Sequence, residues 1–407
     1  MSVADTGPER TTSDAAALRG SNQQGMRAHN ERLVLSLVRQ NGALAKSDIA
    51  RMTGLSAQTV SVIMRGLESD GLLQRGEPVR GRIGQPSVPM SLAADGAFFL
   101  GLKIGRRSTD LVLVDFVGQV RSTHRRVYRY PTPTAVVAFV TEALPGLMAV
   151  LTPVQRDKIS GMGVAMPFQL WNWVHALGAP QAEMDAWRDR DIQGELAAVA
   201  QMPVFVQNDA TSACGAELVF GTGERPKDFL YFYFGTFIGG GLVLNGQLFL
   251  GRTGNAAGVG PMPVPGPDGR FRRLFDSASL AVLAGMMEAQ GESSDHIWER
   301  PDLWQVSDAV LSDWMDAAAE GLASAILAAA TLLELEAVLI DGWMPVAVRA
   351  EVTRRTLAAL GRLDLSGVAP PQVREGTLGA QARSLGAAAI PLSQRYLIDQ
   401  NAAARGV

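Results

Sequence analysis

The chain has 407 residues, a net charge of −3 and 47% hydrophobic residues, a length that predicts two or three domains with ample apolar material for their cores. It has no apolar run near the ~18 residues needed to cross a bilayer and no apolar signal core at its N-terminus, so we expect neither a membrane protein nor an exported one but a cytoplasmic protein. The single cysteine, Cys214, excludes an internal disulfide, and four scattered histidines leave a zinc site almost without ligands, so we expect no metal.

Charge is distributed unevenly along the chain. Residues 1–22 are polar, and we expect them to form a disordered tail. Between Arg27 and Pro86 there are nine basic and five acidic residues, a net charge of +4, which leaves −7 for the rest of a chain whose total is −3. A basic module on an acidic body is the charge layout expected when one end of a protein meets the phosphates of nucleic acid and the other does not.

Residues 23–93 have the pattern of a winged helix-turn-helix domain, which binds DNA. We expect Asn30 to cap a first helix that ends near Asn41, and Ser47 to cap a short second helix. Gly54 then provides a tight turn into the third helix.

The third helix is the expected recognition helix. Ser56 can cap it, and it runs to about Ser69. Its apolar residues follow the i, i+3, i+4, i+7 spacing of one buried face: Val60, Ile63, Met64 and Leu67. We expect this region to contact DNA through short or polar side chains, which suit a helix in the major groove: Ser47, Ser56, Ala57, Gln58, Thr59, Ser61 and Arg65.

Two short predicted strands, 72–75 and 88–92, flank a glycine-rich loop that we interpret as the wing. Its glycines let the backbone approach DNA, and we expect Arg80, Arg82 and Gln85 to contact it, the two arginines being suited to a narrow minor groove. The alternative is a protein-binding module whose arginines form a solvated face. Because the caps, the turn, the apolar stripe, the positive charge and the arginines of the loop all agree, DNA binding is favoured.

Beyond residue 94 the pattern changes to the strands and helices of an α/β domain. The predicted strands cover 98–105, 111–115, 118–120, 159–166, 204–206, 229–234 and 338–341. The predicted helices cover about 135–150 and 312–333, and Asn245-Gly246 predicts a hairpin turn. Asn208 and Asp209 come directly after a strand, so they mark a candidate site at its end.

Five features in a fixed order resemble the ROK family of repressors, open reading frames and sugar kinases: the winged helix and the motifs FFLGLKIG, QNDATSACGAE, GTFIGGGLVLNGQLFLGRTGNAAGVG and LGAAAIPL. The resemblance runs from about Met26 to the end of the sequence. It implies that residues 94–407 form two subdomains of the actin, sugar-kinase and ribonuclease-H type with a ligand cleft between them. It also implies a response to sugars or their derivatives, and assembly as a homodimer or homotetramer.

A sugar kinase needs a carboxylate in its first phosphate loop to hold magnesium and an aspartate to act as catalytic base. The resemblance assigns Asn208 and Asp209 to the pair that binds sugar hydroxyls, with Asp209 as a vestigial base. The loop that reads roughly Asp-Ile-Gly-Gly-Thr in the family's kinases reads KIGRR here, so Lys103 replaces the carboxylate of the metal site. We therefore expect no kinase activity and no cofactor.

Two further sugar-binding positions of the family are changed. Gly258 stands where the family has a glutamate, and Pro261 stands where it has a histidine that also binds zinc in many members. The cysteine cluster that completes that zinc site is absent. These departures agree with the expectation of no zinc and point to an unusual ligand.

The candidate ligand-binding residues are Asn208, Asp209, Trp171, Asn172, Trp173, Gly235, Thr236 and Asn255. Aromatic faces stack on sugar rings and amides bind hydroxyl groups. A purely structural alternative stays open for several of them, because the tryptophans can pack between helices, Asn208 and Asp209 can cap a helix, and the glycines can serve a turn. Lys103 can pair with an acidic group or lie at the cleft wall, and the sequence does not decide this.

The sequence thus predicts a DNA-binding transcriptional regulator, a repressor of carbohydrate metabolism or transport genes, whose degenerate kinase-like domain senses a sugar-like effector. The expected partners are a palindromic double-stranded operator, the effector and further copies of the chain. Two alternatives are an active carbohydrate kinase with a DNA-binding arm, and a constitutive regulator that uses the large domain only as a scaffold.

Overall fold

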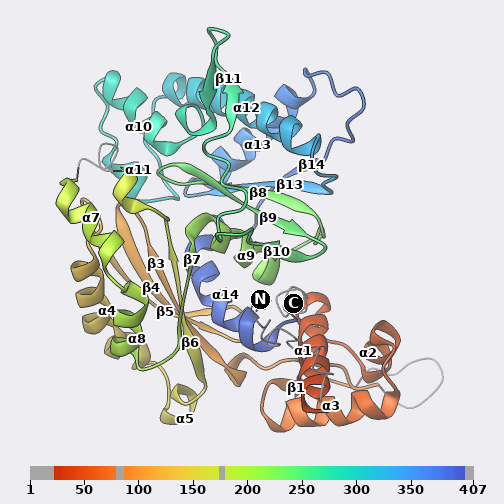
Figure 1. The fold of residues 1–407 in the computed structure, drawn as a ribbon. Coiled ribbons are helices and arrows are strands. Elements are labelled where there is room, and N and C mark those ends of the chain that lie inside the picture. The colour runs from red at the N-terminus through yellow and green to blue at the C-terminus, as the bar shows by residue number, and fades with distance from the viewer. Residues whose placement is uncertain (1–22, 79–86, 174–178, 399–407) are drawn as a thin grey trace, which may run out of the picture.

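A computed structural model describes residues 23–78, 87–173 and 179–398 of the chain (Figure 1). The wing residues Arg80, Arg82 and Gln85, and the predicted tail, lie outside the described residues. The side chains of Asn172 and Trp173 are also outside the described set.

The N-terminal module consists of three helices followed by a two-stranded antiparallel hairpin, as predicted. The helices are α1 (Gln23–Asn41), α2 (Lys46–Thr53) and α3 (Ala57–Ser69), and the strands are β1 (Leu73–Arg75) and β2 (Met90–Leu92). The predicted stripe on the third helix is buried, and it packs against α1 and α2 in one apolar cluster: Val60, Ile63, Met64 and Leu67 with Val34, Val38 and Ile49.

One of the three predicted helix caps is confirmed. The Ser56 hydroxyl accepts a hydrogen bond from the backbone N–H of Thr59 at 3.1 Å, and Gly54 ends α2 in the left-handed conformation, with φ of 70°. This φ favours glycine, because a Cβ atom is strained there.

The caps predicted at Asn30 and Ser47 were wrong. Asn30 lies inside α1, because that helix begins at Gln23. Ser47 lies in the first turn of α2, whose N-cap is the extended residue Ala45. The chain is extended there because Leu44 forms a backbone bridge with Met90, so the helix begins two residues too early for the Ser47 hydroxyl to cap it.

The large domain contains two five-stranded sheets of the same topology. The first has the order β5-β4-β3-β6-β7, and its strands are β3 (Phe98–Ile104), β4 (Ser108–Asp115), β5 (Val120–Val127), β6 (Ile159–Met166) and β7 (Val204–Asn208). The strand predicted at 118–120 begins only at Val120, because Gly118 occupies the preceding turn with φ of 96°.

The second sheet repeats this arrangement with the order β10-β9-β8-β13-β14. Its strands are β8 (Phe229–Phe234), β9 (Ile238–Leu244), β10 (Gln247–Phe249), β13 (Ala337–Gly342) and β14 (Gln372–Glu375). In each sheet three antiparallel strands are followed by two parallel ones. The Asn245-Gly246 turn joins β9 to β10 as predicted. This repetition is the two-subdomain architecture that the family resemblance implies.

Two helices lie between the sheets, α9 (Asp209–Phe220) and α14 (Ala382–Tyr396) (Figure 1). They pack against each other, α14 also packing on β3 and β6 and α9 on β9. The approach of α14 to its sheet is very close, because a Cβ atom added at Gly163 would lie 1.8 Å from the carbonyl oxygen of Ala387. The absence of a side chain at Gly163 therefore allows α14 to pack this closely on the sheet.

The remaining helices of the large domain flank the two sheets (Figure 1). In the first subdomain these are α4 (Pro133–Met148), α5 (Pro153–Arg156), α7 (Gln181–Asp189) and α8 (Ile192–Ala200). In the second they are α10 (Leu280–Ala289), α11 (Asp295–Glu299), α12 (Asp308–Ala330) and α13 (Val346–Leu360), with the small hairpin β11 (Pro263–Pro265) and β12 (Phe271–Arg273). Over the described ranges, none of the helices has the length and apolarity to span a membrane.

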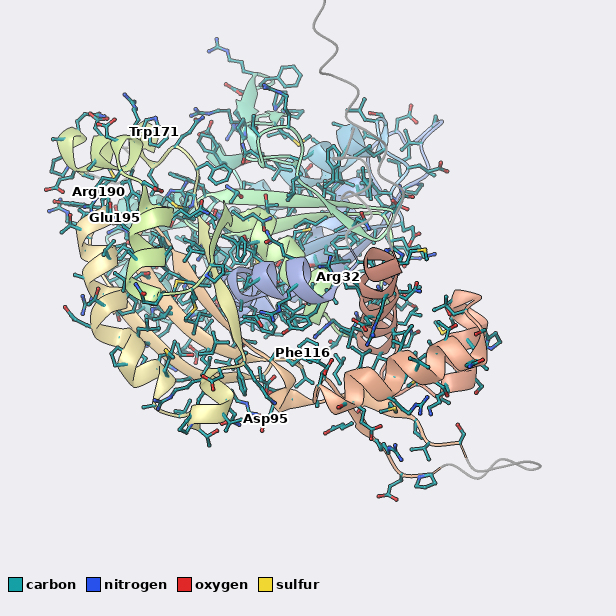
Figure 2. All side chains as sticks on the ribbon, turned by 60° about the horizontal axis from the view of Figure 1, so that its bottom comes forward. Arg32, Asp95, Phe116, Trp171, Arg190 and Glu195 are labelled. Atoms are coloured by element: carbon teal, nitrogen blue, oxygen red, sulfur yellow. The ribbon has the colours of Figure 1, made fainter. Side chains whose placement is uncertain are left out.

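Helix α1 attaches the N-terminal module to the large domain. The Arg39 guanidinium donates to the backbone carbonyl of Phe116 at 2.5 Å and lies over the rings of Phe116 and Phe220. The backbone N–H of Ile398, just after α14, donates to the Ser36 hydroxyl at 3.1 Å. Figure 2 shows Phe116 between the module and the body. The two parts share one apolar cluster, so α1 belongs to both.

Candidate effector cleft and DNA-binding surface

A cleft of about 650 Å³ lies between the two subdomains, at the ends of β6, β7 and β8. It brings together the predicted residues Trp171, Asn208, Asp209, Gly235 and Asn255. A small pocket adjoins it and shares Arg106, Gly235 and Arg383 with it, and Thr236 lines this second pocket instead. The site is therefore assembled from strand ends, where polar side chains lie outside the sheet.

Asn208 caps a helix, which is the structural alternative that the sequence left open for it. Its side-chain carbonyl accepts hydrogen bonds from the backbone N–H groups of Ala210 and Thr211, at 3.0 and 3.1 Å, and so caps α9. Only its amide NH2 group is left to donate to a ligand. The cap fixes the start of α9, and with it the position of the next residue, Asp209.

Asp209 forms an ion pair at the cleft wall. One carboxylate oxygen lies 3.3 Å from a terminal nitrogen of Arg383, and each side chain is only 11% exposed. The Arg383 guanidinium also lies over the Tyr233 ring, 4.9 Å from its centroid. Sequence reasoning missed Arg383, whose signal was an arginine at the start of an alanine-rich helix.

Lys103 pairs with an acidic group, which decides the question that the sequence left open. Its Nζ atom donates to a carboxylate oxygen of Asp110 and to the Ser108 hydroxyl, both at 2.7 Å. Burial lowers the pKa of Lys103 to about 8, although the Asp110 charge acts in the opposite direction. A buried cation therefore occupies the place where the resemblance puts a metal-binding carboxylate.

Three further arginines at the cleft each lie over an aromatic ring. The distances from guanidinium carbon to ring centroid are 4.6 Å for Arg106 on Phe237, 5.8 Å for Arg107 on Trp298 and 4.6 Å for Arg125 on Trp343. Arg125 also reaches a carboxylate oxygen of Asp110 at 3.4 Å. Burial lowers the pKa of Arg106 to about 10, which leaves it charged at neutral pH. The wall of the cleft is strongly cationic.

Trp171 has both of the roles considered for it. It lines the cleft, and it also packs against the apolar core of the first sheet with Arg188 over its ring at 5.4 Å. Figure 2 shows it on the side of the body away from the N-terminal module. Phe168 and Gln169 precede it at the cleft, and Gln169 has a left-handed φ of 55°.

The outward face of α3 presents the side chains expected to contact DNA. Ser56, Ala57, Gln58 and Arg65 are exposed, while Thr59 and Ser61 are half-buried. Val62 is 48% exposed on the same helix and was not predicted. An apolar side chain here can contact the methyl group of thymine, so the residue adds to the candidate DNA-binding surface.

Family models match both the large domain and the N-terminal module. The model of the ROK family matches residues 99–392, which is most of the large domain. The chain belongs to the ROK family. A model of winged helix-turn-helix DNA-binding domains matches residues 27–74.

The chain is also similar to curated proteins. The chain is 24% identical over 371 residues to the protein y4fQ of Sinorhizobium fredii, a match that covers 90% of this chain and 91% of that one. It is 21% identical over 235 residues to the xylose repressor of Bacillus subtilis, a match that covers 58% of this chain. That match spans only 60% of the repressor's own length.

Solved structures confirm the fold. A ROK family transcriptional regulator, described as a homolog of the Escherichia coli Mlc protein, superposes with a TM-score of 0.62 at 19% identity over 91% of this chain and 97% of that one. A ROK glucokinase from Streptomyces griseus, solved with glucose and AMPPNP, gives a TM-score of 0.56 at 22% identity over 72% of this chain and 98% of that one. The large domain thus has the ROK kinase fold, and the regulator match also includes most of the N-terminal module.

Proposed function

We propose that this protein is a DNA-binding transcriptional repressor of carbohydrate metabolism or transport genes, and that its ROK domain senses a sugar-like effector in the cleft. The observation that carries the proposal is a DNA-binding module fixed to a kinase fold whose phosphate loop has Lys103 in place of the metal's carboxylate. The named functions of similar proteins, a xylose repressor and a ROK transcriptional regulator, support it.

The state of the cleft argues against phosphoryl transfer. That reaction needs a metal held near the phosphates and a carboxylate that takes the proton of the attacking hydroxyl. Here Lys103 is held by Asp110, and the Asp209 carboxylate is paired with Arg383. The same residues can still orient a hydroxylated ligand, because binding needs hydrogen bonds and shape but no proton acceptor.

Helix α14 supplies a physical link between the effector cleft and the DNA-binding module. Arg383 at its first turn lines the cleft, and Ile398 just beyond its end is bonded to Ser36 of α1. The helix has 15 residues and so spans about 20 Å. A ligand that binds one state of subdomain closure more tightly than the other would shift the population toward that state. Helix α14, and α1 with it, would be displaced in that state.

We further propose that the protein acts as a homodimer or homotetramer on a palindromic operator. A dimer sets two recognition helices about one turn of DNA apart, so a small change in their spacing has a large effect on affinity. Analytical ultracentrifugation of the free chain and of its DNA complex tests this, and a monomer in both would contradict it.

The experiment for the DNA-binding part is selection of bound duplexes from a random library, followed by affinity measurements on the enriched sequence. Gln58→Ala and Arg65→Ala remove exposed side chains of α3, and we expect each to weaken specific binding at least tenfold. Arg362→Ala is the matched control, because it removes an exposed arginine outside the module. Equal binding by all three variants, or failure to enrich any sequence, would contradict the proposal.

The experiment for the sensor part combines thermal unfolding with a kinase assay on the same panel of sugars and sugar derivatives. A ligand that binds only the folded chain raises the unfolding midpoint. We expect a shift with a sugar-like compound, and no ATP-dependent phosphorylation of it. Turnover that is lost in Asp209→Asn would favour the kinase alternative instead.

A further inference from the structure

The cleft carries more positive charge than its own carboxylates balance. Five cationic side chains line the small pocket, two of which also line the main cleft: Lys103, Arg106, Arg107, Arg125 and Arg383. Three of these cations contact carboxylates, Lys103 and Arg125 sharing Asp110 and Arg383 contacting Asp209. These three cations thus have two carboxylates between them.

Aromatic rings also contact these cations, and they add attraction but no negative charge. Arg106 and Arg383 lie over Phe237 and Tyr233, and an aromatic face attracts a cation through its quadrupole but bears no net charge. Burial of unbalanced charge is costly unless an opposite charge completes the site. An anion between the two subdomains would supply that charge.

Arg383 also has unused hydrogen-bonding capacity. Its Nε atom is buried and has no hydrogen-bond partner among the residues described, while one of its terminal nitrogens is paired with Asp209. Buried donors of this kind are normally satisfied, so an atom left over at a cavity wall points to a ligand or water there. A phosphate or carboxylate oxygen is the acceptor that a guanidinium binds most strongly.

Other residues of the main cleft suit a hydroxylated, partly apolar body. The rings of Phe168 and Trp171 line the main cleft together with Thr253, Asn208 and Asn255. Aromatic faces pack on the apolar faces of sugar rings, and amide and hydroxyl groups bind their hydroxyls. The lining of the main cleft thus combines cationic side chains with aromatic, amide and hydroxyl groups.

We infer that the effector is a sugar derivative with an anionic group, a phosphate or a carboxylate, held directly by Arg106 and Arg383 in the cleft. This inference rests on the proposed sensor function of the same cleft. It differs from the kinases' use of the fold, because the arginines contact the anion of the effector itself and no metal mediates the contact.

The test is calorimetric titration of the full chain with a matched panel of hexose and pentose phosphates, the corresponding aldonic acids, the neutral parent sugars and inorganic phosphate. We expect at least one acid to bind at least tenfold more tightly than its neutral parent, and its affinity to fall as salt is added. The phosphate and aldonate arms then distinguish the two sources of the anion.

Variants connect that affinity to the arginines. Arg106→Gln and Arg383→Gln should each weaken the acid at least tenfold while leaving the neutral parent almost unchanged. Because Arg383 is buried and its loss can impair folding, Arg107→Gln supplies an exposed change in the same pocket, and we expect it to weaken the acid by a smaller factor. Arg362→Gln, outside the cleft, should leave all affinities unchanged.

Three results would overturn the inference. They are a neutral sugar that binds as tightly as its acid, inorganic phosphate that binds as tightly as any sugar acid and so marks an adventitious ion only, and a panel in which no acid binds. Failure of the proposed function is separable from these. If the chain binds sugar acids but no DNA, the inference stands and the proposed repressor function fails. If it binds DNA and responds to a neutral sugar, the repressor function stands and the inference fails.

Discussion

At the scale of single residues, Lys103 is the most informative position of the chain. It stands on β3 and meets Asp110 and Ser108 from β4, while the charges of Arg125 from β5 and Arg383 from α14 face it as well. Where the family resemblance places a metal-binding carboxylate, the chain therefore has a cation together with a carboxylate that pairs with it.

This arrangement predicts a specific dependence of stability on pH. The pKa of Lys103 is lowered by burial to about 8 in the folded chain, and an unfolded lysine titrates near 10.5. Between these values the unfolded chain holds a proton that the folded chain has lost, so the free energy of unfolding rises with pH in that window. We expect a rise of the order of 1–3 kcal/mol for the wild type relative to Lys103→Met, measured by denaturant titration at pH 7.5 and 10.5. An equal pH dependence in both proteins would show that Lys103 titrates normally.

The sequence could predict part of this site. Asn208 and Asp209 were recognisable because they follow a strand within a family motif, and Lys103 was recognisable as a departure from one. Arg383 was not, because its partner Asp209 is 174 positions away along the chain, and only the packing of α14 on α9 brings them together. The cationic wall therefore became visible only in the fold.

At the scale of elements, the N-terminal module gives a direct test of its capping. Ser56→Ala removes a hydrogen bond to the first turn of α3 and should cost about 1 kcal/mol of local stability. Ser47→Ala is the matched control, because Ser47 lies inside the first turn of α2 and caps nothing. Amide hydrogen exchange should be faster at the start of α3 in the first variant only. Comparable effects of the two changes would mean that Ser47 caps α2, as the sequence predicted.

Helix α1 is the element that couples the module to the body, through Arg39. Arg39→Ala removes the bond to the Phe116 carbonyl and the contacts with two aromatic rings, so we expect a loss of about 1–3 kcal/mol in the free energy of unfolding. DNA affinity without effector should change little, while the response of that affinity to the effector should diminish. Arg27→Ala is the control on the same helix, because Arg27 is exposed and pairs with Glu31 of that helix. An undiminished response in Arg39→Ala would place the coupling elsewhere.

Secondary structure was the part of the elements that periodicity could predict. The stripe of α3, the Gly54 turn, the strand pair of the wing and the Asn245-Gly246 hairpin all follow from local pattern. Local pattern did not predict the start of α2, because a tertiary contact, the bridge between Leu44 and Met90, determines it.

At the scale of the whole molecule, the same sheet topology occurs twice, and α9 and α14 lie between the copies. The cleft lies at one end of α14 and the attachment of the DNA-binding module at the other. An effector that contacts Arg383 therefore contacts the element that leads to α1. The family resemblance predicted two subdomains and a cleft, but this route between sensor and reading head required the arrangement of the helices in space.

The central claim is that a ligand in the cleft changes the affinity of the module for DNA. Its most direct test is a fluorescence anisotropy titration of the full chain on the duplex enriched by selection, with and without a saturating amount of the tightest-binding compound of the sugar panel. The account predicts a change in Kd of roughly 5- to 150-fold, the range of a coupling of about 1–3 kcal/mol, and a much smaller change in Arg39→Ala. A Kd that is the same with and without the bound compound would contradict it and identify a constitutive regulator whose large domain is only a scaffold.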